Sequence, residues 1–156
     1  MVKDLNGLTS EEFFAKLSEN FEVKKTIGQF KPTKKGDIGL YIANQWYCMT
    51  TKPHLIDISD PVERLDVAIL QNKVLAPLLG VDDPRTSKRV DFVGGIRGLG
   101  ELEKRVNSGE MQVAFAMYPT SVEELMSIAD AGQIMPPKST WFEPKLRDGL
   151  FVHFLD

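Results

Sequence analysis

The chain has 156 residues, of which 42% are hydrophobic and 26% charged, a composition typical of a folded globular protein rather than of a disordered segment. This length predicts a single domain over residues 1–156 whose core needs neither a disulfide nor a structural metal. The formal net charge of -3 gives no general attraction to phosphate backbones or anionic lipids, so we expect neither a nucleic-acid partner nor a membrane partner.

Cysteine use and the start of the chain favour a cytoplasmic location. Cys48 is the single cysteine, so no internal disulfide can form. Its neighbours include no group that obviously lowers a thiol pKa, which favours a small buried hydrophobe over a reactive thiol. The first residues are polar and do not resemble a secretory signal, and no apolar stretch approaches the roughly 20 residues that span a bilayer.

The first third of the chain predicts a helix followed by an antiparallel meander. A capping hydroxyl at Thr9 or Ser10 begins the helix, and Phe13, Phe14 and Leu17 recur near helical spacing. Three strands follow, at residues 21–24 with an extension to residue 30, at residues 38–42 and at residues 46–50. A turn at residues 31–37 separates the first two strands, and Asn44 and Gln45 separate the last two.

The middle of the chain predicts one helix between two turn signals. Asp60 and Pro61 have the form of a capping carboxylate followed by proline at the first helical position. Apolar residues recur up to Gly80, and Pro77 is expected to end or kink this helix.

The last part, residues 90–132, predicts a strand, a helix, a second strand and a second helix. The strands are residues 90–93 and 113–117, and the helices are residues 101–107 and the segment from Ser121 to Gly132. Such a β-α-β-α unit favours parallel pairing through a right-handed crossover. The predicted fold is therefore α+β, with a mixed sheet that is antiparallel first and parallel second.

Few residues suggest a catalytic centre. His54 and His153 are far apart in the sequence and have no ligand partner at a familiar spacing, so we expect no metal site, and no pattern of a nucleophilic triad occurs. The glycines of residues 94–100 lie between a predicted strand and a helix, where backbone N–H groups can hold an anion; an ordinary flexible turn is the alternative.

The most unusual segment is Met135–Lys145. Two prolines stiffen the backbone just before Lys138, Ser139 and Thr140, so these side chains can be preorganised donors for a phosphate or a carboxylate. The alternative is a rigid loop in which Trp141 and Phe142 pack on the core.

The segment Met135–Lys145, together with Pro119–Leu125 and Ile128–Gly132, resembles the C-terminal signature of a microbial family catalogued as domain of unknown function 1015. Residues 65–70 and 75–80 are similar to a helix of that family. The resemblance covers about residues 8–155. The family's Gly-His-His-Arg-Tyr-Glu motif is absent from this chain, which has no His-His pair. The resemblance therefore implies the C-terminal portion of a longer protein.

The resemblance also implies an activity, because some relatives are thought to be free-serine kinases that use pyrophosphate or a nucleotide. On this basis we expect the substrate-side portion of a phosphotransferase, inactive alone, whose partner is the N-terminal half of the same protein. Lys138, Ser139 and Thr140, with Lys145 as a weaker fourth, are the implied contacts to a phosphate compound or an amino acid. The base would come from the other half. The cofactor stays open, with Mg²⁺ as the candidate in the full-length protein.

A different class of function stays open beside this one. The chain can instead be a non-catalytic binding or oligomerisation module, in which Trp46, Tyr47, Trp141 and Phe142 contribute to a protein interface. A surface that normally docks on another domain would also favour a homodimer.

Overall fold

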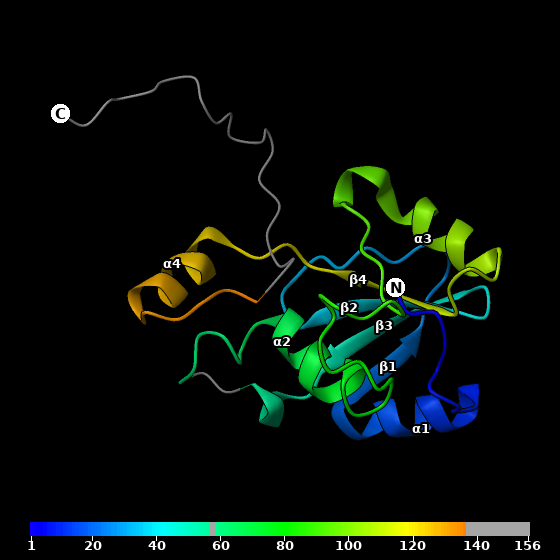
Figure 1. The fold of residues 1–156 in the computed structure, drawn as a ribbon, viewed down its shortest axis with the longest axis horizontal. Helices are drawn as coiled ribbons and strands as arrows, with labels where there is room; N and C mark the ends of the chain where they lie inside the picture. Colours follow the sequence, from blue (N-terminus) through cyan, green and yellow to red (C-terminus); the bar gives the residue numbers. More distant parts are fainter. Residues whose placement is uncertain (57–58, 137–156) are drawn as a thin grey trace.

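The computed structural model describes residues 1–56 and 59–136 and shows an α+β fold (Figure 1). Its four strands, β1 (Phe21–Lys25), β2 (Asp37–Ile42), β3 (Gln45–Thr51) and β4 (Val113–Met117), form one sheet in the order β1-β3-β2-β4. All three pairs of neighbouring strands are antiparallel. The predicted fold class is thus confirmed, whereas the predicted mixed sheet is wrong.

The predicted hairpin of β2 and β3 forms, with its turn at residues 43–44, one residue earlier than predicted. Ala43 and Asn44 have φ angles of 50° and 60°, and Ile42 pairs with Gln45. Positive φ at both central residues is the conformation of the two-residue turn whose twist matches that of the flanking strands. Asparagine tolerates this region better than most residues, which explains why the turn lies at residues 43–44. β1 ends at Lys25 and does not continue to residue 30.

The second half of the sheet differs from the prediction because the N-terminal residues take the place of a strand. Val2 forms antiparallel bridges to both Val113 and Val90, so it lies between β4 and the segment that was predicted as a strand at residues 90–93. Only Val90 of that segment has a bridge. β4 in turn pairs antiparallel with β2, which leaves no parallel pair and no crossover unit among the described residues.

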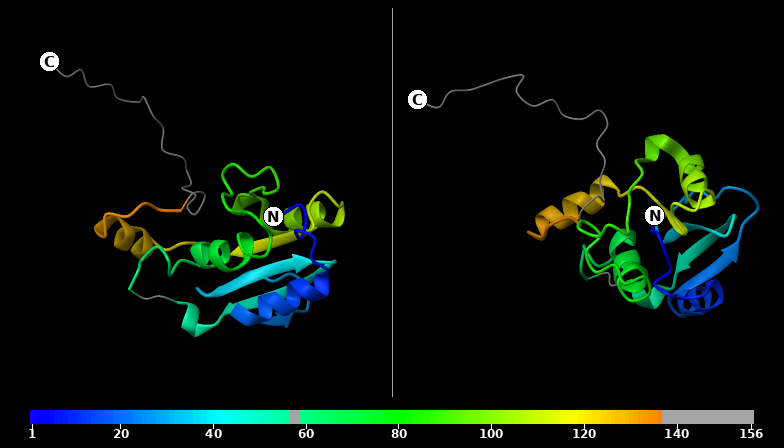
Figure 2. Two further views of the ribbon diagram at one scale, coloured as in Figure 1. Left: turned by 60° about the horizontal axis from the view of Figure 1, so that its bottom comes forward. Right: turned by 45° about the vertical axis from the view of Figure 1, so that its right-hand side comes forward.

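α1 (Ser10–Asn20) begins at the predicted capping residue. The Thr9 hydroxyl accepts the Glu12 N–H, and the Glu12 carboxylate accepts the Thr9 N–H, which forms a complete capping box. Phe13 and Leu17 lie one turn apart on the buried face. This apolar stripe packs α1 against one face of the sheet (Figure 2).

α2 (Asp66–Leu70) begins later than predicted. Asp60 accepts the N–H groups of Val62 and Glu63 and so caps a turn, while the helix itself starts after Leu65. From Gln71 to Leu75 the helix widens to π-type turns, with Ala76 N–H donating to the Gln71 carbonyl five residues back. Pro77 follows directly, and its missing N–H and bulky ring account for the end of regular α-helical bonding.

The other helices agree closely with the sequence. α3 (Gly98–Asn107) follows a short 3₁₀ turn at Gly95–Arg97 and ends before Gly109, whose φ is 79°. α4 (Val122–Asp130) starts with a capping box of Ser121 and Glu124. A further 3₁₀ turn, Pro53–Leu55, follows β3.

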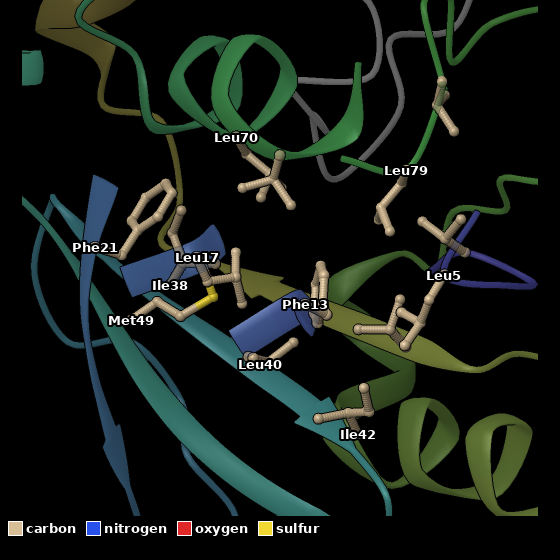
Figure 3. Close-up of a cluster of buried hydrophobic side chains, with 14 of the residues drawn as sticks. Leu5, Phe13, Leu17, Phe21, Ile38, Leu40, Ile42, Met49, Leu70 and Leu79 are labelled. Atoms are coloured by element: carbon tan, nitrogen blue, oxygen red, sulfur yellow. The ribbon is translucent and has the colours of Figure 1, made fainter. Parts of the chain in front are cut away.

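Two hydrophobic clusters lie on the two faces of the sheet. On one face, α1 and α2 cover the sheet, and Leu70 of α2 faces Phe13 and Leu17 of α1 across the cluster shown in Figure 3. On the other face, Leu102 of α3 packs with Tyr41 and Trp46. Both faces of β2 are therefore buried, and all six of its residues are buried.

Gly39 of β2 is required by close packing, and its replacement by alanine is expected to destabilise the fold. A Cβ atom at residue 39 would lie 2.9 Å from the Phe30 carbonyl oxygen, 3.1 Å from Ala116 Cβ and 3.2 Å from Trp46 Cζ3. We expect Gly39→Ala to lower the free energy of unfolding by about 1 to 3 kcal/mol, measured by urea denaturation.

The matched control is Gly100→Ala in α3, where an added Cβ meets no atom within 4 Å. Alanine is favoured over glycine inside a helix by roughly 0.5 to 1 kcal/mol, so the control should raise stability. Equal effects of the two substitutions would show that the contacts at Gly39 do not limit packing.

Candidate functional site

The residues predicted to bind phosphate or substrate, Lys138, Ser139, Thr140 and Lys145, lie outside the described residues, as do Trp141, Phe142 and His153. Their roles therefore stay predictions. The structure does show where the chain runs just before them. Met135 packs against a small cluster that contains Leu65 and Ile128, and Gln133 Nε2 donates to Asp60 Oδ2 at 3.4 Å. The described chain thus reaches Pro136 beside the start of α2.

Charged side chains gather near this point, and we call Lys35, Asp37, Asp66 and Glu124 the Asp66 cluster. Both carboxylate oxygens of Asp66 accept the Gly36 N–H, each at 3.0 Å. Lys35 forms an ion pair with Glu124, and Asp37 Oδ1 accepts the Thr50 hydroxyl at 2.8 Å. The cluster therefore combines three carboxylates with one ammonium group.

Asp66 is the member of the cluster with the most unusual electrostatic environment. It is 9% exposed, and this burial raises the pKa of its carboxyl above the ordinary value. The Gly36 N–H and the Lys35 ammonium oppose the shift, whereas the charges of Glu124 and Asp37 add to it. A carboxyl whose pKa is raised by burial holds a proton more strongly, as a general base must.

A second buried polar group lies next to the same loop. The Thr51 N–H donates to the Gly36 carbonyl at 2.9 Å, and the Thr51 hydroxyl is buried without a hydrogen-bond partner. Loop residue 36 is therefore held from two sides, by Thr51 of β3 and by Asp66 of α2. Asp66 therefore has a structural role, which is to fix this loop, and any chemical role of Asp66 comes in addition to it.

Sequence reasoning did not select Asp66, although a signal was present. Asp66 is flanked by Leu65 and Val67 within an otherwise apolar run, and a lone carboxylate in such a run indicates burial. What the sequence could not show is that Lys35 and Glu124, far away along the chain, approach it.

The glycine-rich segment has the geometry of a helix start without a side-chain cap. Gly98 has a φ of 69°, and no side chain caps the first turn of α3, in contrast to α1 and α4. Arg97, immediately before it, is exposed. This arrangement leaves backbone N–H groups free for solvent or for an anion, so the two alternatives for residues 94–100 stay open.

Cys48 and His54 show no sign of a catalytic role. Cys48 is half-buried, and burial raises the pKa of its thiol, which disfavours the reactive thiolate, as the sequence predicts. His54 is exposed in the 3₁₀ turn after β3. Within residues 1–56 and 59–136, no three His, Cys, Asp or Glu side chains are grouped so as to hold a metal ion.

A polar pocket of about 230 Å³ lies at the β2–β3 hairpin, next to α3. The residues that line it include Tyr41, Trp46, Glu103, Asn44 and Asn107. A wider groove of about 730 Å³ adjoins it and shares Asn44 and Asn107. Figure 1 shows the hairpin and α3 at the opposite end of the molecule from α4, so this pocket is separate from the Asp66 cluster.

In the described part of the chain, no helix has both the length and the apolar character needed to cross a membrane.

Comparison with known proteins identifies a family over the first part of the chain. No curated protein and no solved structure matches the chain. Residues 1–68 match the family described as "Protein of unknown function (DUF1015)". The match includes α1, β1, β2, β3 and the first turn of α2 with Asp66, while Pro119–Leu125 and Met135–Lys145 lie beyond the matched range. The predicted resemblance to this family is confirmed for residues 1–68, the range that its model matches.

Proposed function

We propose that this chain is the substrate-side portion of a phosphotransferase of the free-serine kinase type, which uses pyrophosphate or a nucleotide and is inactive without its N-terminal half. The observation that carries the proposal is the buried Asp66, whose pKa is raised and which lies near Lys35 and Glu124. Met135, three residues before Lys138, packs against an apolar cluster that contains Leu65, the residue next to Asp66. The proposal places the protein in the cytoplasm, where L-serine and the phosphoryl donor both occur.

Phosphoryl transfer to a hydroxyl gives each of these residues a defined task. The hydroxyl oxygen of the acceptor forms a bond to phosphorus, the bond from phosphorus to the donor's bridging oxygen breaks, and the hydroxyl proton has to leave. The Asp66 carboxylate is the group proposed to accept that proton. This assignment replaces our expectation that the other half supplies the base.

The remaining groups of such a site come from elsewhere. Lys138, Ser139, Thr140 and Lys145 are proposed to contact the phosphate compound, and Mg²⁺ is proposed to bind only in the full-length protein. We expect no activity from the chain alone because the Lys35 ammonium is already paired with Glu124, and Lys138 and Lys145 without Mg²⁺ would not neutralise a transferring phosphoryl group.

Isothermal titration of the purified chain with L-serine, pyrophosphate, ATP and ADP tests the proposal. We expect at least one of these compounds to bind. Lys138→Ala should weaken the binding of a phosphate compound, and Asp66→Asn should weaken the binding of L-serine, each by tenfold or more. Asp66→Asn keeps the shape of the side chain but removes the charge that accepts the proton. Lys16→Ala, at an exposed position of α1, is the matched control for charge loss and should change nothing.

A folded sample that binds none of the four compounds contradicts the proposal. Binding that both Asp66→Asn and Lys138→Ala leave unchanged contradicts the assigned site. Circular dichroism of each variant shows whether the loss of binding is separate from loss of the fold, since Asp66 also holds Gly36.

A non-catalytic assembly module is the second candidate, and the surface of α4 favours it. Val122 and Met126 are four residues apart on this helix and are 67% and 59% exposed, and Ile134 shortly after it is 89% exposed. Trp46, by contrast, is 3% exposed and belongs to the core, so it does not contribute to such an interface. Self-association that depends on the α4 surface, without binding of any of the four compounds, would favour this candidate.

A further inference from the structure

The pocket at the β2–β3 hairpin, which we call the hairpin pocket, has a carboxylate fixed in place by two neutral donors. Trp46 Nε1 donates to Glu103 Oε1 and Gln29 Nε2 donates to Glu103 Oε2, each at 2.7 Å. A carboxylate can accept about four hydrogen bonds, so each oxygen of Glu103 has capacity for another donor. Among the described residues, no lysine, arginine or histidine forms an ion pair with Glu103.

The side-chain amides beside the Tyr41 hydroxyl add further acceptor atoms to the pocket. The hydroxyl lies 2.8 Å from the Asn44 side-chain amide and 3.0 Å from that of Asn107. A hydroxyl has only one hydrogen, so at most one of these amides can accept from it through oxygen. With its amide group turned over, the other side chain would donate an N–H to the Tyr41 oxygen and direct its own oxygen elsewhere.

Several donors of the hairpin pocket are already in use, and the amide N–H groups of Asn44 and Asn107 are its other side-chain donors. Gln45 Nε2 donates to the Thr26 carbonyl at 2.8 Å and to the Trp46 carbonyl at 2.7 Å. The Trp46 indole and the Gln29 amide both donate to Glu103. Because the Glu103 carboxylate is negatively charged, it would repel a phosphate or a carboxylate, whereas it would attract a positively charged ligand that carries N–H donors.

Aromatic rings favour the same kind of ligand. Tyr41 and Trp46 are both among the residues that line the pocket, and their ring centroids lie 5.0 Å apart with planes at 41°. Cations are attracted to the faces of such rings, and the attraction adds to that of a nearby carboxylate. The volume of about 230 Å³ lies below the roughly 300 to 1,000 Å³ of pockets that hold drug-sized molecules, which indicates a small ligand.

We propose that the hairpin pocket is a binding site for a small primary ammonium compound, with Glu103 as the counter-ion and Tyr41 and Trp46 as the aromatic wall. The three N–H donors of a primary ammonium group match the Glu103 carboxylate and an amide oxygen of Asn44 or Asn107. This site lies at the opposite end of the molecule from the Asp66 cluster and is independent of the phosphotransferase proposal (Figure 1).

A pair of matched probes tests this proposal on the full chain. Ethanolamine carries the ammonium group, and ethylene glycol is its uncharged counterpart of nearly the same shape. In ¹H–¹⁵N spectra at pH 7, we expect ethanolamine to shift the indole N–H signal of Trp46 in a saturable manner, because that N–H donates to Glu103. Ethylene glycol should produce no saturable shift. Equal responses to the two probes would overturn the proposal.

Variants of two glutamates of α3 assign the site. Glu103→Gln removes the charge in the pocket and is expected to weaken ethanolamine binding at least tenfold, while Glu101→Gln, two residues away and outside the pocket, should leave it unchanged. Unchanged binding by a folded Glu103→Gln variant would overturn the assignment. If that variant does not fold, the comparison of the two probes on the unaltered chain still tests the proposal.

Guanidinium ion is the third probe. If it binds as tightly as ethanolamine, the assignment of the ligand as a primary ammonium compound is overturned.

Discussion

Phe13→Ala is expected to lower the free energy of unfolding by about 3 to 5 kcal/mol, the largest effect of any single substitution considered for this protein. Phe13 has no exposed surface and lies where α1, α2 and the sheet meet (Figure 3). Its truncation removes the transfer free energy of the ring and leaves a cavity that packed neighbours such as Leu17 and Leu40 cannot fill. Urea denaturation followed by circular dichroism measures the change.

Phe14→Ala is the matched control, because it removes the same ring one residue later in the same helix. Phe14 is only half-buried and contacts the ring of Tyr47, with centroids 4.8 Å apart. We therefore expect a loss well below that of Phe13→Ala. If the two losses were equal, the helix would present a different face to the sheet from the one in the structure.

The buried N-terminal amine is expected to make stability fall between pH 8 and pH 6. The amine of Met1 donates to the Asp91 carbonyl at 2.9 Å, and burial lowers its pKa from 8.0 to about 6, despite the opposing attraction of the Asp91 carboxylate. In the unfolded chain the amine keeps its ordinary pKa, so between these two pH values the unfolded state binds more protons. Stability therefore decreases as the pH falls through this window, by roughly 2 to 3 kcal/mol in total.

The comparison that isolates this effect is between the chain and its Nα-acetylated form, both verified by mass to retain Met1. The free energy of unfolding is measured at pH 8.5 and pH 5.5. His54 is present in both samples, and ion-paired carboxylates such as Asp91 and Glu110, whose pKa values are lowered, act at more acidic pH. We expect the acetylated chain to lose less stability across this range. An equal loss in both forms would show that the amine is not the cause.

Local signals in the sequence predict the helices and the hairpin well. The capping box at Thr9 and the one at Ser121 each depend on residues three positions apart, and the turn at residues 43–44 lies within a single hairpin. Interactions of this range can be recognised without knowing the rest of the fold. The strand at residues 113–117 was equally recognisable from its continuous apolar run.

Apart from the late start of α2 and the early end of β1, the errors involve partners that are distant in the sequence. Periodicity indicates that β4 is a buried strand but not that it pairs antiparallel with β2, nor that Val2 bridges it to Val90. The Asp66 cluster likewise joins residues 35 and 124 with the start of α2. The hairpin pocket brings Glu103 of α3 to Trp46 of β3. Such sites depend on tertiary packing, which single-sequence patterns do not contain.

The strand order has a consequence for the order of events during folding. Strand β2 meets β3 across the short turn at residues 43–44, whereas it meets β4 only after the chain has closed a loop of residues 43–112. By loop-closure entropy, the second pairing costs on the order of 3 kcal/mol more than the first. We therefore expect the hairpin to be formed early in the transition state and β4 to be added late. Substitutions in β4 should then mainly accelerate unfolding, while substitutions in the hairpin should slow refolding.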